Sequence, residues 1–367
     1  DPIPHSMQVA LIANTAWLEE QLATLHHLVA GLWEESVRVV QDLPMDRAEA
    51  EVVSFGSRLS WRERRGRIRN RRALNRLAVP LKEQGVELIH ALDGRQWRGA
   101  LDLGKQLAVP VVLSANSGMD IELAARVAGR LQPGQHTVLC ATEPLKQLVD
   151  QAIGGVVPVR HVPFGVHLGK PAPRSEGETP CVVISGDGGF DDYTHRLLAG
   201  AKQAIEAHPD LQLFFDGQRQ DPRALWRAIR RQDLLANATL IPRRLGHREV
   251  LLRAGAMVHP QPLGRSRSLT LRAMAHAVPV LACADPLLDD LIDGQTARVL
   301  HDPSPDAWAK ALISFASDSK PWRELGLSAQ QWVGQHRLAS TQLEHLIVTY
   351  RHLTGEPIAF PTSAATA

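Results

Sequence analysis

The sequence alternates, in two series, between short runs typical of buried β-strands and longer runs with apolar residues at helical spacing. In the first series the strand-like runs lie at 8–13, 37–40, 51–55, 88–92, 109–113, 137–140 and 159–162, with helical patterns at 19–33 and 62–84. In the second series the strand-like runs lie at 181–185, 211–216, 239–241, 257–259 and 279–282, with helical patterns at 193–207 and 307–353. Such alternation predicts parallel sheets covered by helices on both faces.

The length and the break between the two series predict two domains. A chain of 367 residues is too long for one comfortable core. The segment 169–180 holds three prolines and two glycines, which is linker composition. We therefore expect two doubly wound, Rossmann-like α/β domains, 1–168 and 181–337, joined by this linker. Ligands of such proteins bind at the carboxyl ends of the strands.

Composition excludes several classes of protein. The net charge of +2 gives no field that points to nucleic acid. The sequence has no run of about 18 apolar residues, so it predicts no membrane span. No signal-peptide pattern is visible. The three cysteines, Cys140, Cys181 and Cys283, lie far apart in apolar runs, as reduced core thiols do. We expect a cytoplasmic protein.

The segment 263–282 is the most informative for chemistry. A polar loop with one glycine leads into a short helical pattern, followed by a strand-like Val-Pro-Val-Leu-Ala. A helix that starts there presents backbone N–H groups suited to an anion such as phosphate, and Arg265 and Arg267 would add two charged donors. The alternative is that both arginines are solvated residues of an ordinary connection.

Several motifs recur in an order and at spacings that resemble a known group of proteins. His-Val-Pro-Phe-Gly-Val at 161–166 is similar to an interdomain turn, and the segments at 207–217 and 248–260 are similar to parts of a nucleotide-binding domain. Ala-Met-Ala at 273–275 before Val-Pro-Val at 278–280, Asp-Gly-Gln-Thr at 293–296 and a tyrosine at 350 continue the pattern. Together they resemble the retaining GT-B glycosyltransferases, in particular family four.

The resemblance implies a function and assigns the domains. The domain 181–337 would bind a nucleotide-diphosphate sugar, the domain 1–168 an acceptor, and a helix at 338–360 would cross back to the first domain. The reaction would be hexosyl transfer with retention, without a cofactor or a metal. The sequence names neither the sugar and nucleotide nor the acceptor.

The sequence departs from the family pattern at its chemical positions. Where the family has two glutamates eight positions apart, this chain has Gly264 and Arg272. A guanidinium only donates hydrogen bonds, so Arg272 cannot replace a carboxylate that accepts from ribose. Asp187 stands where the family has an arginine, Asp191 and Asp192 where it has a lysine, and Asn116 where it often has a histidine.

Two interpretations of these departures stay open. In the first, the protein is a reprogrammed transferase with His90 and Asn116 as candidate catalytic residues. Its donor site would be formed by Gly186, Asp187, Arg243, Arg244, Gly264, Arg265, Ser266, Arg267, Ser268, Leu269 and Arg272. The three aspartates near 190 resemble a cation site, but an exposed acidic loop is more common. In the second interpretation, the protein is a non-catalytic relative that serves as a binding or partner subunit.

The segment 62–76 carries eight arginines and one acid. It is either a solvated helix face with arginine stems packed on the domain or a surface for anionic lipid at the inner face of a membrane. Nucleic acid fits least, because few aromatic residues are interleaved.

Overall fold

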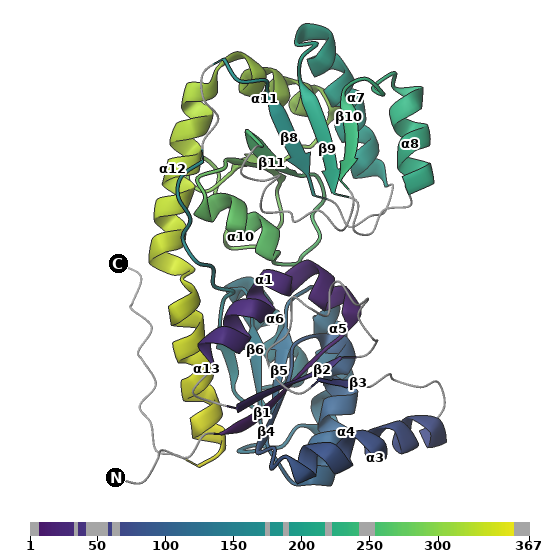
Figure 1. Cartoon of the computed structure of the whole chain (residues 1–367), viewed down its shortest axis with the longest axis vertical. Coiled ribbons are helices and arrows are strands. Elements are labelled where there is room, and N and C mark those ends of the chain that lie inside the picture. Colours follow the sequence, from purple (N-terminus) through teal and green to yellow (C-terminus); the bar gives the residue numbers. More distant parts are fainter. Residues whose placement is uncertain are drawn as a thin grey trace. The chain divides into compact units, whose positions relative to one another are not determined.

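The computed structural model describes residues 7–32, 36–41, 58–60, 67–172, 177–185, 191–216, 222–241 and 254–355. The chain divides into two compact units (Figure 1). Unit 1 comprises 1–165 together with 339–367, and unit 2 comprises 166–338. Unit 1 is therefore built from two separate stretches of sequence, because the last helix belongs to it.

Seven parallel strands form one sheet among the described residues of unit 1. The strands are β1 (Gln8–Ala13), β2 (Ser36–Gln41), β3 (Arg58–Ser60), β4 (Leu88–Ala91), β5 (Val111–Ala115), β6 (His136–Cys140) and β7 (Val159–His161). The helices are α1 (Thr15–Gly31), α3 (Arg67–Glu83), α4 (Trp97–Leu107), α5 (Met119–Val127), α6 (Glu143–Ile153) and α13 (Ala339–Leu353), with 3-10 turns η1 (Gly94–Gln96) and η2 (Ala128–Arg130).

The described part of unit 2 has a second parallel sheet, of six strands. They are β8 (Cys181–Ile184), β9 (Gln212–Asp216), β10 (Ala238–Ile241), β11 (Ala256–His259), β12 (Val280–Cys283) and β13 (Arg298–Leu300). The helices are α7 (Asp192–Ala207), α8 (Pro222–Arg231), α10 (Ser268–Ala275), α11 (Pro305–Ser317) and α12 (Ser319–His336).

The strand order makes both sheets doubly wound, as the alternation predicted. In unit 1 the order is β3-β2-β1-β4-β5-β6-β7, and in unit 2 it is β10-β9-β8-β11-β12-β13. Each chain path starts at an inner strand, runs to one edge and then returns to run to the other. The direction reverses between β1 and β4 and between β8 and β11, and such a switch point is where ligands of open α/β sheets bind.

Some predicted segments lie outside the described residues. The strand expected at 51–55 is one of them, and so is the beginning of the basic segment at 62–66. The rest of that segment is helical in α3, where Arg72 and Arg76 are exposed. The predicted linker begins on the surface of unit 2: the amides of Gly169 and Ala172 donate to Ala275 at 3.0 Å and His276 at 2.8 Å.

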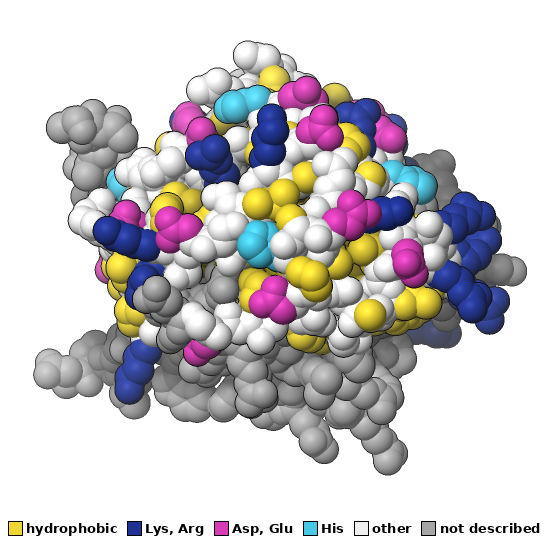
Figure 2. Space-filling model, turned by 90° about the horizontal axis from the view of Figure 1, so that it is seen from above, with side chains coloured by type: hydrophobic (Ala, Val, Ile, Leu, Met, Phe, Trp, Pro, Cys, Tyr) yellow, Lys and Arg dark blue, Asp and Glu magenta, His cyan; other side chains and the backbone are white. Residues whose placement is uncertain are grey.

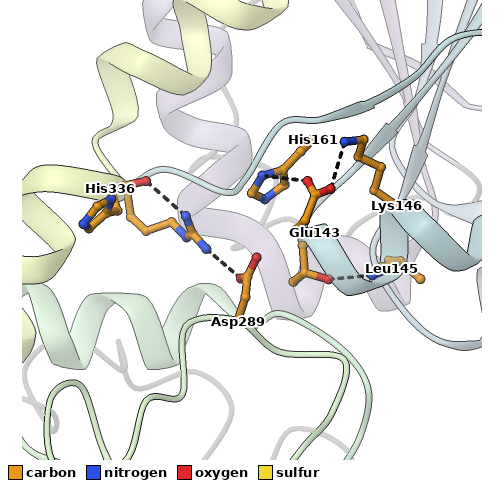
Figure 3. A network of polar contacts seen from close by, with 8 residues as sticks. Glu143, Leu145, Lys146, His161, Asp289 and His336 are labelled. Atoms are coloured by element: carbon orange, nitrogen blue, oxygen red, sulfur yellow. Dashed lines mark hydrogen bonds and ion pairs between the residues drawn. The ribbon is translucent and has the colours of Figure 1, made fainter. Parts of the chain in front are cut away.

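Helix α6 of unit 1 starts in a network of polar contacts (Figure 3). Thr142 caps the helix by accepting from the amide of Leu145 at 3.4 Å. Glu143, in the first turn, binds the ammonium of Lys146 at 2.8 Å and lies 3.6 Å from Nδ1 of His161. A carboxylate in the first helical turn also complements the helix dipole, so several weak terms fix this helix start.

Helix α12 of unit 2 ends in a second network, also drawn in Figure 3. Arg337 donates to the carboxylate of Asp289 at 2.7 Å and to the carbonyl of His336 at 3.2 Å. Its guanidinium lies 4.9 Å from the ring centre of Trp332, as in a cation–π contact. Because Arg337 is buried, these contacts compensate a charge that would be costly to leave alone.

Candidate functional site

The switch point of unit 2 gathers polar residues at the carboxyl edge of its sheet. Ser185 follows β8, His259 ends β11, and α10 begins after the next loop. Because all strand pairs are parallel, these residues leave the sheet on the same side. This edge is the candidate ligand site of unit 2.

Arg267 connects the start of α10 to the end of β8 at this switch point. It is the residue before α10, only 6% of its surface is exposed, and its Nη1 donates to Oγ of Ser185 at 2.5 Å. The contact joins positions 82 residues apart. A positive charge is therefore held at the start of a helix whose first amides have no acceptor within the helix. Arg267 is thus not a solvated loop residue.

His259 lies in the field of the two arginines. Its side chain is 1% exposed, and burial together with the charges of Arg267 and Arg265 lowers its pKa to about 3. The imidazole is therefore neutral at physiological pH. Oγ1 of Thr270 lies 3.5 Å from its Nδ1. The shift places Arg265, which is half-buried, in the same electrostatic environment as Arg267.

The loop before α10 is held by an acid that follows β12. Gly264 has a φ of +56°, a conformation that suits glycine, and its amide donates to Oδ2 of Asp285 at 2.6 Å. Oδ1 of the same carboxylate accepts from the amide of Leu287 at 3.0 Å. Asp285 thereby fixes the loop that carries the arginines.

The other predicted donor residues of this segment lie along the start of α10. Ser266 and Ser268 are buried, whereas Leu269 and Arg272 are half-buried. Arg272 lies one turn beyond the first residues of the helix. The structure thus brings the predicted segment from Gly264 to Leu269 to one edge of one sheet.

The acids near 190 have structural contacts. Asp191 caps α7, where its Oδ1 accepts from the amide of Thr194 at 2.9 Å. Its Oδ2 accepts from Nε2 of Gln261 at 2.6 Å. Asp192 pairs with Arg196 at 2.6 Å. Four further predicted donor residues, Gly186, Asp187, Arg243 and Arg244, lie outside the described residues.

In unit 1 the candidate His90 connects the central sheet to the last helix. Its Nδ1 lies 2.6 Å from the hydroxyl of Tyr350 in α13, and its Nε2 lies 2.7 Å from Oγ of Ser114. Burial lowers the pKa of His90 to about 3 and raises that of Tyr350 above its ordinary range. Both ring nitrogens are therefore engaged, which is the geometry of a structural histidine.

The second candidate, Asn116, shapes the loop after β5. Its side-chain amide donates to the carbonyl of Leu92 at 2.6 Å, and its backbone amide donates to Oδ2 of Asp120 at 2.7 Å. Burial and the charge of Asp93 raise the pKa of Asp120 to about 6, while the backbone amide hydrogen bonds oppose the shift. His90 and Asn116 line one small cavity with Trp17, on the scale of a single water molecule.

No protein-family model matches the chain, and no curated protein matches it. Several solved structures have a similar fold. A glycosyltransferase from Rickettsia africae superposes with a TM-score of 0.72 at 10% identity, over 96% of this chain and 100% of that one. HepE of Anabaena, solved with UDP and glucose, superposes with a TM-score of 0.73 at 13% identity, over 94% of this chain and 99% of HepE. Sucrose-phosphate synthase of Thermosynechococcus elongatus superposes with a TM-score of 0.71 at 15% identity, over 95% of this chain and 99% of the synthase chain.

These similarities extend over both units, and with the two doubly wound sheets they decide the fold class. The chain has the GT-B fold. Identities of 10–15% show the fold alone. In the described part of this GT-B protein, no helix is both long and apolar enough to cross a membrane.

Sequence reasoning missed several residues at the two edges of the GT-B sheets. Ser185, Gln261 and Asp285 in unit 2 were not expected, and neither was Asp120 in unit 1. Their shared signal is position, since each lies in a segment that follows a strand of a parallel sheet. That rule finds the segment, but it does not tell which residue holds the loop and which would face a ligand.

Proposed function

We propose that this protein is a glycosyltransferase of the retaining, family-four-like type, which transfers a hexosyl group from a nucleotide-diphosphate sugar. The diphosphate would bind at the start of α10, where the backbone amides of 266–269 and the guanidinium groups of Arg265 and Arg267 gather. The acceptor would bind unit 1. The donor is a substrate, and the proposal includes no cofactor and no metal.

The observation that carries the proposal is the placement of Arg267. It is buried before α10 and bonded to Ser185 across the switch point. This is the part of a doubly wound sheet where phosphate groups bind. Arg265, half-buried in the same loop, could add donors to the anion from the solvent side.

Charge of this sign suits the leaving group. In the transfer, the bond between the anomeric carbon and the diphosphate oxygen breaks, and a bond to the acceptor oxygen forms. The acceptor proton passes to the departing phosphate oxygen. Negative charge therefore develops on the diphosphate, and fixed donors aimed at it would lower the barrier. The neutral His259 adds no positive charge of its own, so the two arginines supply the field.

The similar structures support the same class of substrate. HepE is solved with UDP and glucose, and in a further crystal with UDP-glucose. At this level of identity they support a proposal about the ligand and no more. A non-catalytic relative is the second candidate, favoured by Arg272, which cannot replace a ribose-binding carboxylate, and by the structural hydrogen bonds of His90.

Calorimetry with UDP, GDP and ADP, and with UDP- and GDP-hexoses, tests the site. We expect saturable binding of at least one nucleotide. Arg265→Gln should weaken it about tenfold or more, because a hydrogen bond to a charged group contributes about 1.5–3 kcal/mol. Arg298→Gln removes an exposed arginine from edge strand β13 of the same unit and should bind like the wild type. Release of nucleoside diphosphate from the sugar donor measures turnover.

The outcomes separate the two candidates. Nucleotide binding without any release of nucleoside diphosphate would favour the non-catalytic relative. If no nucleotide binds at millimolar concentration, the donor site itself is wrong. If Arg265→Gln and Arg298→Gln bind equally well, the anion does not bind at α10.

A further inference from the structure

Helix α8 of unit 2 presents a basic face to solvent. Arg223, Arg227, Arg230 and Arg231 are all exposed, and they follow one another at positions i, i+4, i+7 and i+8. This spacing places them on one side of a helix. The helix contains no acidic residue, and the turn after it adds one exposed acid, Asp233. Figure 2 shows Lys and Arg side chains gathered at its right-hand edge.

The opposite side of α8 is anchored firmly. Leu225, Ala228 and Ile229 are buried in the core of unit 2, and Leu234 of the next turn joins them. The basic face is therefore carried on a packed helix and not on a mobile segment. Its arginines cannot turn inward without breaking this core.

An aromatic residue lies within α8 and an exposed apolar residue follows it in the sequence. Trp226 is half-buried against the core, and Leu235, just beyond the helix, is 50% exposed. Tryptophan and leucine are suited to the boundary between lipid headgroups and acyl chains. Guanidinium groups bind phosphate with two parallel hydrogen bonds. A lipid surface offers both kinds of contact at once.

We propose that α8 is a docking surface for an anionic lipid bilayer. Arg223, Arg227, Arg230 and Arg231 bind lipid phosphates, and Trp226 and Leu235 contact the headgroup boundary. The inference is independent of the donor site at α10. It does not depend on the lipid interpretation of the basic segment 62–76, which stays a separate prediction.

Co-sedimentation with vesicles tests the surface. One set contains phosphatidylcholine alone, and the other also contains phosphatidylglycerol; both are used at low and high salt. We expect the full chain to bind the anionic vesicles and to be released by salt, because the attraction is screened. The triple variant Arg223→Gln, Arg227→Gln, Arg230→Gln should lose roughly a hundredfold in partitioning, since each basic residue near an anionic surface contributes about a fivefold factor.

The matched control removes the same number of positive charges from exposed positions of unit 2 outside α8. The control variant Arg298→Gln, Lys310→Gln, Lys320→Gln changes three exposed residues of unit 2 that lie outside α8, and it should bind anionic vesicles like the wild type. Leu235→Ser should bind several-fold more weakly than the wild type while keeping the salt dependence. All variants change exposed side chains, so an unchanged melting temperature verifies that they are folded.

Three results would overturn the proposal. The first is equal binding of the wild type to neutral and anionic vesicles. The second is a loss in the control variant as large as in the α8 variant. The third is α8-dependent binding of a labelled single-stranded RNA oligonucleotide together with no binding to vesicles, which would make the partner a nucleic acid.

Discussion

Asp290 illustrates how burial acts on a single acid in unit 2. Its side chain is 3% exposed. Burial and the charge of Asp289 raise its pKa to about 6, although the positive charge of Arg337 acts in the opposite direction. In the unfolded chain the pKa returns to 3.8. Between these two values the folded protein keeps a proton that the unfolded chain has lost.

The sign of the pH dependence follows from that difference. The contribution of Asp290 to stability is fully present below the unfolded pKa and falls as the pH rises through about 6. Asp290→Asn cannot ionise, so relative to the wild type it should gain about 1–3 kcal/mol between pH 4 and pH 7. Urea unfolding at both pH values measures this. Asp302→Asn, which removes an exposed carboxyl of unit 2, is the control. A constant difference between wild type and Asp290→Asn at both pH values would contradict the argument.

At the residue scale the sequence predicted the local structure around the candidate site, but not the contacts of its residues. The loop with Arg265 and Arg267 could be placed at a helix start, because the strand after it is easy to recognise. The burial of Arg267 and its bond to Ser185 could not be predicted. The two residues lie 82 positions apart, and no local pattern relates them. The same holds for His90 and Tyr350, separated by 260 positions.

At the scale of elements, α7 and α11 of unit 2 approach so closely that a glycine is required between them. A Cβ on Gly200 would lie 2.4 Å from the carbonyl oxygen of Pro305 and 2.6 Å from Cβ of Trp308. Neither atom is the end of a flexible side chain. The two helices would have to move apart to admit a methyl group.

Gly200→Ala should therefore destabilise unit 2 by about 1–3 kcal/mol, as overpacking does, even though alanine is the better helix former by about 1 kcal/mol. Gly334→Ala in α12 is the control, because its nearest atom is the end of the Leu168 side chain at 3.3 Å. It should be neutral or slightly stabilising. Thermal unfolding of both variants makes the comparison, and equal melting temperatures would argue against tight packing of α7 on α11.

Element boundaries show where local patterns stop being informative. The strand expected at 109–113 is β5, which begins two residues later, at Val111. Helix α4 ends at Ala108 with a φ of +57°, and Pro110 has no amide to donate to a sheet. The helical region expected at 307–353 is three helices, because Asp318 caps the start of α12 and Arg337 ends it. Apolar spacing alone does not reveal such caps.

At the scale of the whole molecule, unit 1 needs the last helix, α13, to complete its buried contacts. Gln342 of α13 lies 2.7 Å from Nε2 of His27 and accepts from the amide of Gly165 at 2.8 Å. Leu346 is buried, and Tyr350 contacts His90. Unit 2, in contrast, is one continuous stretch with its own core. The two series of strands in the sequence predicted two sheets, but contacts over such separations decide which sheet receives the last helix.

This difference predicts unequal behaviour of fragments. Val166–Leu338 should fold alone, with a cooperative thermal transition by circular dichroism, because it loses none of its core. Residues 1–165 should not, because removal of α13 takes away the hydrogen bonds of His27 to Gln342 and of His90 to Tyr350, at about 1–3 kcal/mol each, and exposes the apolar surface under Leu346. Adding a peptide of residues 339–355 should restore a folded state of fragment 1–165. If 1–165 unfolds cooperatively without the peptide, α13 is dispensable for the folding of unit 1. Residues 1–165 would then be an independent domain by themselves.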